Sequence, residues 1–158
     1  MKLLIFIVFL FSQITFVFAA DTSGDSGEKK ESYEYTKTDS KTFNSAKIEI
    51  AAKNFPKAIE LLEEELISSP LNADVWNLIG FSARNIGDFD KSMNAYNKAL
   101  TIDSKHKGAL EYKGELFLKL GDLKNAEKLL EKLNNLCNFN CKERDTLKKS
   151  ISKYKSNS

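Results

Sequence analysis

The sequence contains few of the residues on which catalytic sites depend. Among 158 residues there are one histidine, two cysteines and one tryptophan. Nucleophilic catalysis by serine or cysteine usually needs a base, most often histidine, and no serine stands in a G-x-S-x-G motif. Neither G-x-G-x-x-G nor G-x-x-x-x-G-K-[ST] occurs, which argues against the common nucleotide sites. We therefore expect a protein that is not an enzyme and carries no cofactor.

The sequence also contains little proline and glycine, and neither charge is in large excess. There are two prolines and seven glycines, whereas Lys, Leu, Glu and Asn are plentiful, and such a composition favours helices. The 24 basic residues nearly balance the 22 acidic residues. Nothing in that balance demands nucleic acid or an anionic membrane as a partner. A chain of this length most often forms one domain, so we expect a single all-α domain.

A long apolar run occurs only at the start of the chain. Lys2 is its single charge, and the run ends at the small residues Ala19 and Ala20. A charged start, an apolar centre and a small-residue end are typical of a secretory signal peptide. Cleavage after Ala19 would place Val17 and Ala19 at the two small-residue positions, so we predict a signal peptide at 1–19. The alternative is an uncleaved membrane anchor, although a span needs ~20 apolar residues.

The next segment, 20–38, is polar and charged and shows no apolar periodicity. It cannot bury enough apolar surface to offset the entropy lost on ordering. We predict that it is a disordered linker.

The rest of the chain repeats itself at a fixed spacing, which two glycine positions make visible. Gly80 coincides with Gly114, and at the same spacing Gly87-Asp88 coincides with Gly121-Asp122. Glycine tolerates the left-handed residue that closes a helix, and aspartate can cap the next helix. Each unit is therefore a helical hairpin. Gly80 falls inside a predicted helix, which suggests that the second helix of its hairpin approaches closely there.

The middle unit carries a known repeat pattern: Trp76-x2-Ile79-Gly80-x2-Ala83, followed by Ser92-x3-Tyr96. This resembles the tetratricopeptide repeat (TPR), W-x2-L-G-x2-Y…A-x3-F…P. The third unit gives Leu110-x2-Lys113-Gly114-x2-Phe117, whereas the first is degenerate before Asn54. The resemblance implies a short TPR solenoid of about three repeats, at 39–72, 73–106 and 107–140.

The two cysteines, Cys137 and Cys141, lie between the last repeat and the C-terminal segment. A pair this close in an oxidising compartment suggests a disulfide. A zinc site would need two further ligands, which His106 alone cannot supply; we expect His106 at a surface position at a helix start. An exported TPR domain with this cysteine spacing looks like the small periplasmic TPR proteins of Gram-negative bacteria, which favours the periplasm as its location.

The C-terminal segment, 142–158, is predicted to form a capping helix. Leu147, Ile151 and Tyr154 form one apolar stripe, and the terminal repeat of a solenoid needs such a cover. Its other face is basic, which most often means a solvated surface and otherwise suggests docking to an acidic partner or a membrane.

The TPR resemblance implies a concave groove, lined by the first helix of each hairpin, that binds a protein or peptide. We expect Phe43 and Phe81 to be its apolar anchors unless they pack between helices. The acidic pair Glu111 and Glu115 favours a ligand with basic residues. The alternative function is a structural subunit of an envelope assembly that docks through its convex face or basic C-terminal helix. Mapped onto this sequence, the groove consists of Phe43, Lys47, Asn77, Phe81, Arg84, Glu111, Glu115 and Leu118.

Overall fold

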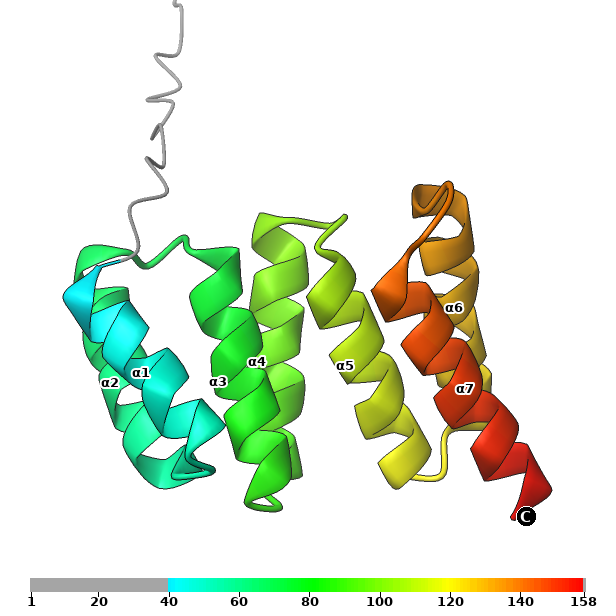
Figure 1. Ribbon diagram of the computed structural model, residues 1–158, viewed down its shortest axis with the longest axis horizontal. Helices are drawn as coiled ribbons and strands as arrows, with labels where there is room; N and C mark the ends of the chain where they lie inside the picture. Colours follow the sequence, from blue (N-terminus) through cyan, green and yellow to red (C-terminus); the bar gives the residue numbers. More distant parts are fainter. Residues whose placement is uncertain (1–39, 158) are drawn as a thin grey trace, which may run out of the picture. The chain divides into compact units, whose positions relative to one another are not determined.

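The structure, a computed structural model, describes residues 40–157, which form seven α-helices (Figure 1). The predicted signal peptide and linker lie outside the described residues. Each predicted repeat range contains one helical hairpin, and α7 begins where the capping helix is expected. The helices are α1 (Lys41–Ala51), α2 (Phe55–Ser68), α3 (Ala73–Asn85), α4 (Phe89–Ile102), α5 (Lys107–Lys119), α6 (Leu123–Leu136) and α7 (Lys142–Ser156).

The hairpin turns follow the local signals of the sequence. Gly87 and Gly121 have φ values of 85° and 78°, the left-handed conformation expected of a closing glycine. Asp88 accepts a hydrogen bond from the Lys91 backbone and so caps α4. The first hairpin departs from this pattern: Lys53 takes the left-handed position with φ 61°, and Asn54 makes no side-chain cap bond. Asn54 instead donates to Glu49, so it occupies the N-cap position of α2 without making the capping bond.

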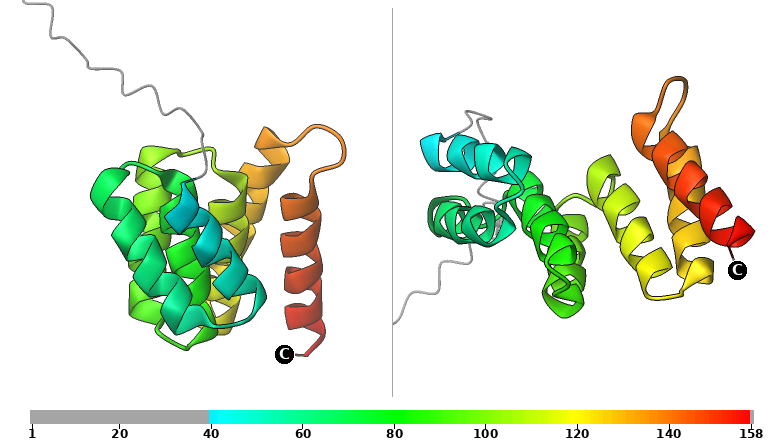
Figure 2. Two further views of the ribbon diagram at one scale, coloured as in Figure 1. Left: turned by 60° about the vertical axis from the view of Figure 1, so that its left-hand side comes forward. Right: turned by 60° about the horizontal axis from the view of Figure 1, so that its bottom comes forward.

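The hairpins stack so that α3, α5 and α7 run along one side, with α4 and α6 behind them (Figures 1 and 2). Inside the middle hairpin, Gly80 of α3 faces the buried ring of Tyr96 on α4. Ser92 Oγ donates to the Gly80 carbonyl oxygen over 2.8 Å. The close approach predicted at Gly80 is therefore present, and it brings α3 and α4 together.

Helix α7 covers the end of the last hairpin. Leu147 and Ile151 are buried, Tyr154 is half-buried, and Leu147 occupies the space beside Gly114 of α5. A disulfide joins Cys137, at the end of α6, to Cys141, the N-cap residue of α7. Because this link spans only the turn, it restrains where α7 starts relative to α6.

Candidate functional site

Helices α3 and α5 pack against each other along a seam, and the contacting residues of the two helices are matched at one fixed separation along the sequence. Arg84 pairs with Glu115, and the rings of Phe81 and Tyr112 pack against each other at a tilt of 43° with their centroids 5.0 Å apart. One turn further, Asn77 lies against Gly108: a Cβ placed on this glycine would be 3.2 Å from Asn77 Nδ2. The separation along the sequence is the same in all of these pairs, so one face of α3 runs opposite one face of α5.

Arg84 is the centre of this seam. Its guanidinium bonds to Glu115 Oε2 over 2.5 Å, and only 8% of the side chain is exposed. The guanidinium carbon also lies 5.7 Å from the ring centroid of Phe81 and 5.5 Å from that of Tyr112, within cation–π range. The other oxygen of Glu115 accepts from Ser150 Oγ over 3.1 Å. Glu115 therefore ties α3, α5 and α7 together.

Glu111 lies one turn before Glu115 on α5 and is buried. Burial raises the pKa of its carboxyl group to about 7, and the charges of Glu115 and of Glu143 on α7 contribute to that rise, against the opposing effect of Arg84. Glu111, Glu115 and Glu143 thus form a group of carboxylates at the junction of α5 and α7. We call the combined region the α3–α5–α7 surface; it consists of Asn77, Phe81, Arg84, Glu111, Tyr112, Glu115, Glu143 and Ser150.

The raised pKa of Glu111 predicts a stability that falls with rising pH. Between the ordinary value of 4.5 and about 7, the unfolded chain loses this proton while the folded protein keeps it, so the free energy of unfolding declines across that window. Glu111→Gln removes the titration and should stabilise the protein by on the order of 2 kcal/mol at about pH 8, and by much less at about pH 5. Urea unfolding at both pH values, with the exposed Glu131→Gln as control, measures this difference; an equal gain at both would contradict it.

Two buried polar atoms of the surface have no hydrogen-bond partner. Among the described residues, such atoms are Asn77 Oδ1, Ser82 Oγ, Arg84 Nε and Tyr96 Oη. Asn77 and Arg84 belong to the surface, and their side chains supply one acceptor and one donor. Leaving buried polar atoms unpaired costs free energy.

The structure brings together five of the predicted groove residues and separates three. The five are Asn77, Phe81, Arg84, Glu111 and Glu115. Phe43 is 5% exposed and packs in the core between the first two hairpins, so the alternative reading, packing between helices, is the right one for it. Lys47 lies over the Phe43 ring, 4.9 Å from its centroid. Leu118 is buried in the core formed with α6 and α7.

Three members of the α3–α5–α7 surface were not among the predicted groove residues: Tyr112, Glu143 and Ser150. Tyr112 could have been found, because it follows Phe81 at the same distance along the sequence as Glu115 follows Arg84. Glu143 and Ser150 could not, since their place depends on how α7 packs against α5. That packing leaves no periodic signal in the sequence.

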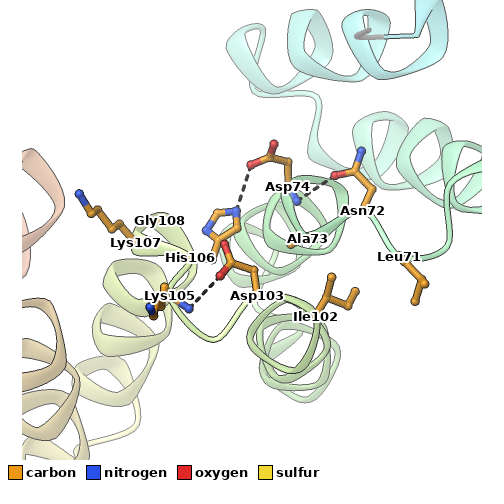
Figure 3. A pocket seen from close by; sticks show the side chains of 10 residues that line it. All are labelled: Leu71, Asn72, Ala73, Asp74, Ile102, Asp103, Lys105, His106, Lys107 and Gly108. Atoms are coloured by element: carbon orange, nitrogen blue, oxygen red, sulfur yellow. Dashed lines mark hydrogen bonds and ion pairs between the residues drawn. The ribbon is translucent and has the colours of Figure 1, made fainter. Parts of the chain in front are cut away.

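A separate hollow of about 440 Å³ lies where α3 and α5 begin (Figure 3). Two of its polar side chains, Asn72 and His106, cap helices. Asn72 accepts from the backbones of Asp74 and Val75, and His106 Nδ1 accepts from the Ala109 backbone. His106 Nε2 lies 3.0 Å from Asp74 Oδ1, so the neutral ring donates to that carboxylate. These contacts join the second and third repeats, so the hollow is explained by the junction between them.

His106 is at a helix start, as predicted, and it lines the hollow with its side chain partly buried, at 12% exposure. Because Nδ1 caps α5, His106→Ala should lower the free energy of unfolding by about 1 kcal/mol. His106→Asn should retain most of that stability, since Asn72 caps α3 at the equivalent position. Chemical denaturation of the three proteins measures both changes. Equal losses for the two variants would show that the cap does not matter.

The described residues offer little for other kinds of site. No group of three or more His, Cys, Asp or Glu side chains among them could hold a metal ion. None of the helices α1 to α7 is both long enough and apolar enough to cross a membrane.

Comparison with known proteins identifies the class. A tetratricopeptide-repeat family model matches residues 73–106, the range of the middle repeat. The chain belongs to the tetratricopeptide-repeat family. It is 30% identical over 132 residues to the uncharacterized protein ycf37 of Pyropia yezoensis, a match that covers 81% of this chain and 71% of that protein.

Solved structures share the fold. The Sgt2 TPR domain from Aspergillus fumigatus aligns with a TM-score of 0.65 at 21% identity, over 74% of this chain and 76% of that one. The Yersinia enterocolitica type III secretion chaperone SycD, in complex with a peptide of the translocator YopD, aligns with a TM-score of 0.63 at 17% identity, over 73% of this chain and 88% of that one. The predicted all-α TPR solenoid is confirmed.

Proposed function

We propose that this protein is a non-catalytic adaptor of the cell envelope, and that it binds a peptide segment of another protein along the α3–α5–α7 surface. The observation that carries the proposal is the α3–α5 seam, where the half-buried rings of Phe81 and Tyr112 lie beside the Arg84 guanidinium. The described residues cover these two rings only in part, so they offer apolar contact to a peptide.

Two further observations support the binding role. SycD, which shares the fold, forms a complex with a peptide of YopD. Both ring nitrogens of His106 are engaged, one by the α5 backbone and one by Asp74, so the single histidine is poorly placed to act as a base.

The envelope location rests on the signal-peptide pattern of 1–19 and on the cysteine pair joined between α6 and α7. Expression of the whole chain in a Gram-negative host, followed by fractionation and N-terminal sequencing, tests it. We expect a periplasmic protein that begins at Ala20. Recovery in the membrane fraction with Met1 intact would favour the uncleaved anchor, and recovery in the cytoplasm would overturn the location.

Selection from a random linear peptide library on the immobilised whole chain tests binding. Tyr112→Ala should weaken the selected peptides by about tenfold or more, because it removes a ring from the surface. Phe139→Ala is the matched control: Phe139 is 95% exposed, on the turn between α6 and α7. Circular dichroism and thermal melting confirm that both variants fold. A selection that yields no binder, or binders insensitive to Tyr112→Ala, would overturn the proposal.

The second candidate, a structural subunit of an envelope assembly, is favoured by exposed apolar side chains outside the α3–α5–α7 surface. Ile67 is 85% exposed and Phe139 95% exposed. Single exposed apolar residues are common on soluble proteins, so this reading is the weaker one. Loss of partner binding by Phe139→Ala or Ile67→Ser, with Tyr112→Ala unaffected, would favour it.

A further inference from the structure

The turn that precedes α7 exposes an aromatic ring. Phe139 is 95% exposed, more than any other large apolar side chain among the described residues. Two links fix this turn to α7: the disulfide of Cys137 and Cys141 closes it, and Arg144 Nη1 donates to the Asn138 carbonyl oxygen over 3.1 Å. The ring is therefore carried at the start of α7, and the turn and the helix form one unit.

Helix α7 carries a row of lysines that begins beside this turn. Lys142, Lys149 and Lys153 are exposed, and their spacing of i, i+7 and i+11 places them on one face of the helix. They form no ion pair with any described residue, and Asp145, the exposed acidic residue of α7, pairs with Arg144 instead. Because α7 is the last helix of the stack (Figure 1), this row faces solvent.

Positive charge is concentrated at this end of the chain. Helices α6 and α7 together contain nine basic and four acidic residues, whereas residues 40–122 contain eleven basic and twelve acidic residues. The nearly balanced total charge of the chain conceals this difference. An anionic surface is therefore attracted to the last two helices rather than to the rest of the described fold.

The types of side chain indicate which anionic surface fits. Interfaces between proteins are enriched in Arg and depleted in Lys, and the row consists of lysine alone. Lysine is a flexible, strongly hydrated point charge, which suits mobile lipid headgroups. Segments that bind at a membrane interface combine such charges with apolar or aromatic side chains that enter the headgroup boundary. One exposed apolar residue needs no explanation by itself, but Phe139 stands next to the lysine row.

We propose that the Phe139 turn and the lysine row of α7 bind the surface of an anionic lipid bilayer. The lysines lie against the headgroups, and the Phe139 ring enters the boundary between headgroups and acyl chains. None of these residues belongs to the α3–α5–α7 surface, so membrane binding is independent of the proposed peptide binding. A protein with both sites holds its peptide partner at a membrane.

Cosedimentation with lipid vesicles tests the proposal. The chain from Ala20 is used, because the apolar run of 1–19 would bind lipid by itself. All seven described helices and both buried clusters lie within 40–157, so this form keeps the fold, which circular dichroism and thermal melting check. We expect binding to vesicles with about one-third phosphatidylglycerol, weakening as salt rises, and little binding to phosphatidylcholine alone.

Charge variants locate the site. Lys149→Gln combined with Lys153→Gln should weaken binding to the anionic vesicles by about tenfold or more. The matched control makes the same change at Lys41 of α1 and Lys98 of α4, both exposed, and should stay within about twofold of the parent.

Variants of Phe139 report on the ring. Phe139→Ser should weaken binding by about fivefold, because the apolar contact is lost. The fluorescence of Phe139→Trp should shift to the blue when anionic vesicles are added, and the parent protein, whose single tryptophan is Trp76, supplies the background.

Several outcomes would overturn the proposal: equal binding to both kinds of vesicle, binding to neither, equal losses for the two lysine pairs, or Phe139→Trp fluorescence that does not shift. A single-stranded oligonucleotide and polyglutamate are assayed in parallel. Binding of either one that depends on Lys149 and Lys153, without binding to vesicles, would assign the row to an anionic polymer instead of a membrane.

Discussion

Replacing Gly80 by alanine should lower the free energy of unfolding by about 2 to 3 kcal/mol, although alanine is the better helix former. A Cβ at this position would lie 2.5 Å from Cε1 and 2.6 Å from Cδ1 of the Tyr96 ring. That ring is fully buried, and Ser92 bonds to the Gly80 carbonyl, so neither side can move away without disturbing the α3–α4 contact. The strain should therefore exceed the gain in helix propensity.

Gly108→Ala is the control for this prediction. It makes the same chemical change inside a helix, but its nearest neighbour is the amide end of Asn77 at 3.2 Å, which can shift by a few tenths of an ångström. We expect its free energy of unfolding to stay within about 1 kcal/mol of the parent. Denaturant titrations of the two variants measure the difference. A Gly80→Ala protein as stable as Gly108→Ala would contradict the close packing of α3 on α4.

The second large effect is expected at Arg84. Arg84→Met keeps much of the side-chain volume but removes the charge, and should cost about 2 to 3 kcal/mol. Glu115 loses its buried partner, and the rings of Phe81 and Tyr112 lose the cation beside them. Because Glu115 is 24% exposed, solvent offsets part of the loss.

A double-mutant cycle separates the pair from its surroundings. Glu115→Gln alone should also destabilise the protein, since it leaves the Arg84 charge buried. The combination of Arg84→Met with Glu115→Gln should cost less than the sum of the two single changes, by about 1 kcal/mol or more. Additive losses would mean that the ion pair contributes nothing beyond its separate side chains.

The sequence was sufficient for the hairpins because their signals are local. A helix-closing glycine followed by an aspartate cap marks the turns at Gly87 and Gly121, and apolar spacing marks the buried stripes. The sequence signal for the first hairpin is weak because Lys53 and Asn54 stand where the later turns have glycine and aspartate. The fold class follows from the recurrence of such patterns at one fixed spacing.

The site was only partly predictable because it depends on packing between helices. Assigning one face of each first helix to the groove selects Asn77, Arg84 and Glu111, which all belong to the α3–α5–α7 surface. The same assignment fails for Phe43, whose ring turns into the core between the first two hairpins. It also omits Ser150, which reaches Glu115 because Leu147 of α7 fills the space beside Gly114. Inter-helix packing of this kind is set by side-chain volume rather than by periodicity.

The most direct test of the central claim is an NMR titration of the isotope-labelled whole chain with a peptide from the library selection. Binding to the α3–α5–α7 surface predicts the largest changes in amide chemical shift at Asn77, Tyr112 and Ser150. The exposed positions Lys98 of α4 and Glu127 of α6 should stay nearly unchanged. Shift changes confined to α2, α4 and α6, with Asn77 and Tyr112 unaffected, would contradict the account and move the interface to the other face of the solenoid.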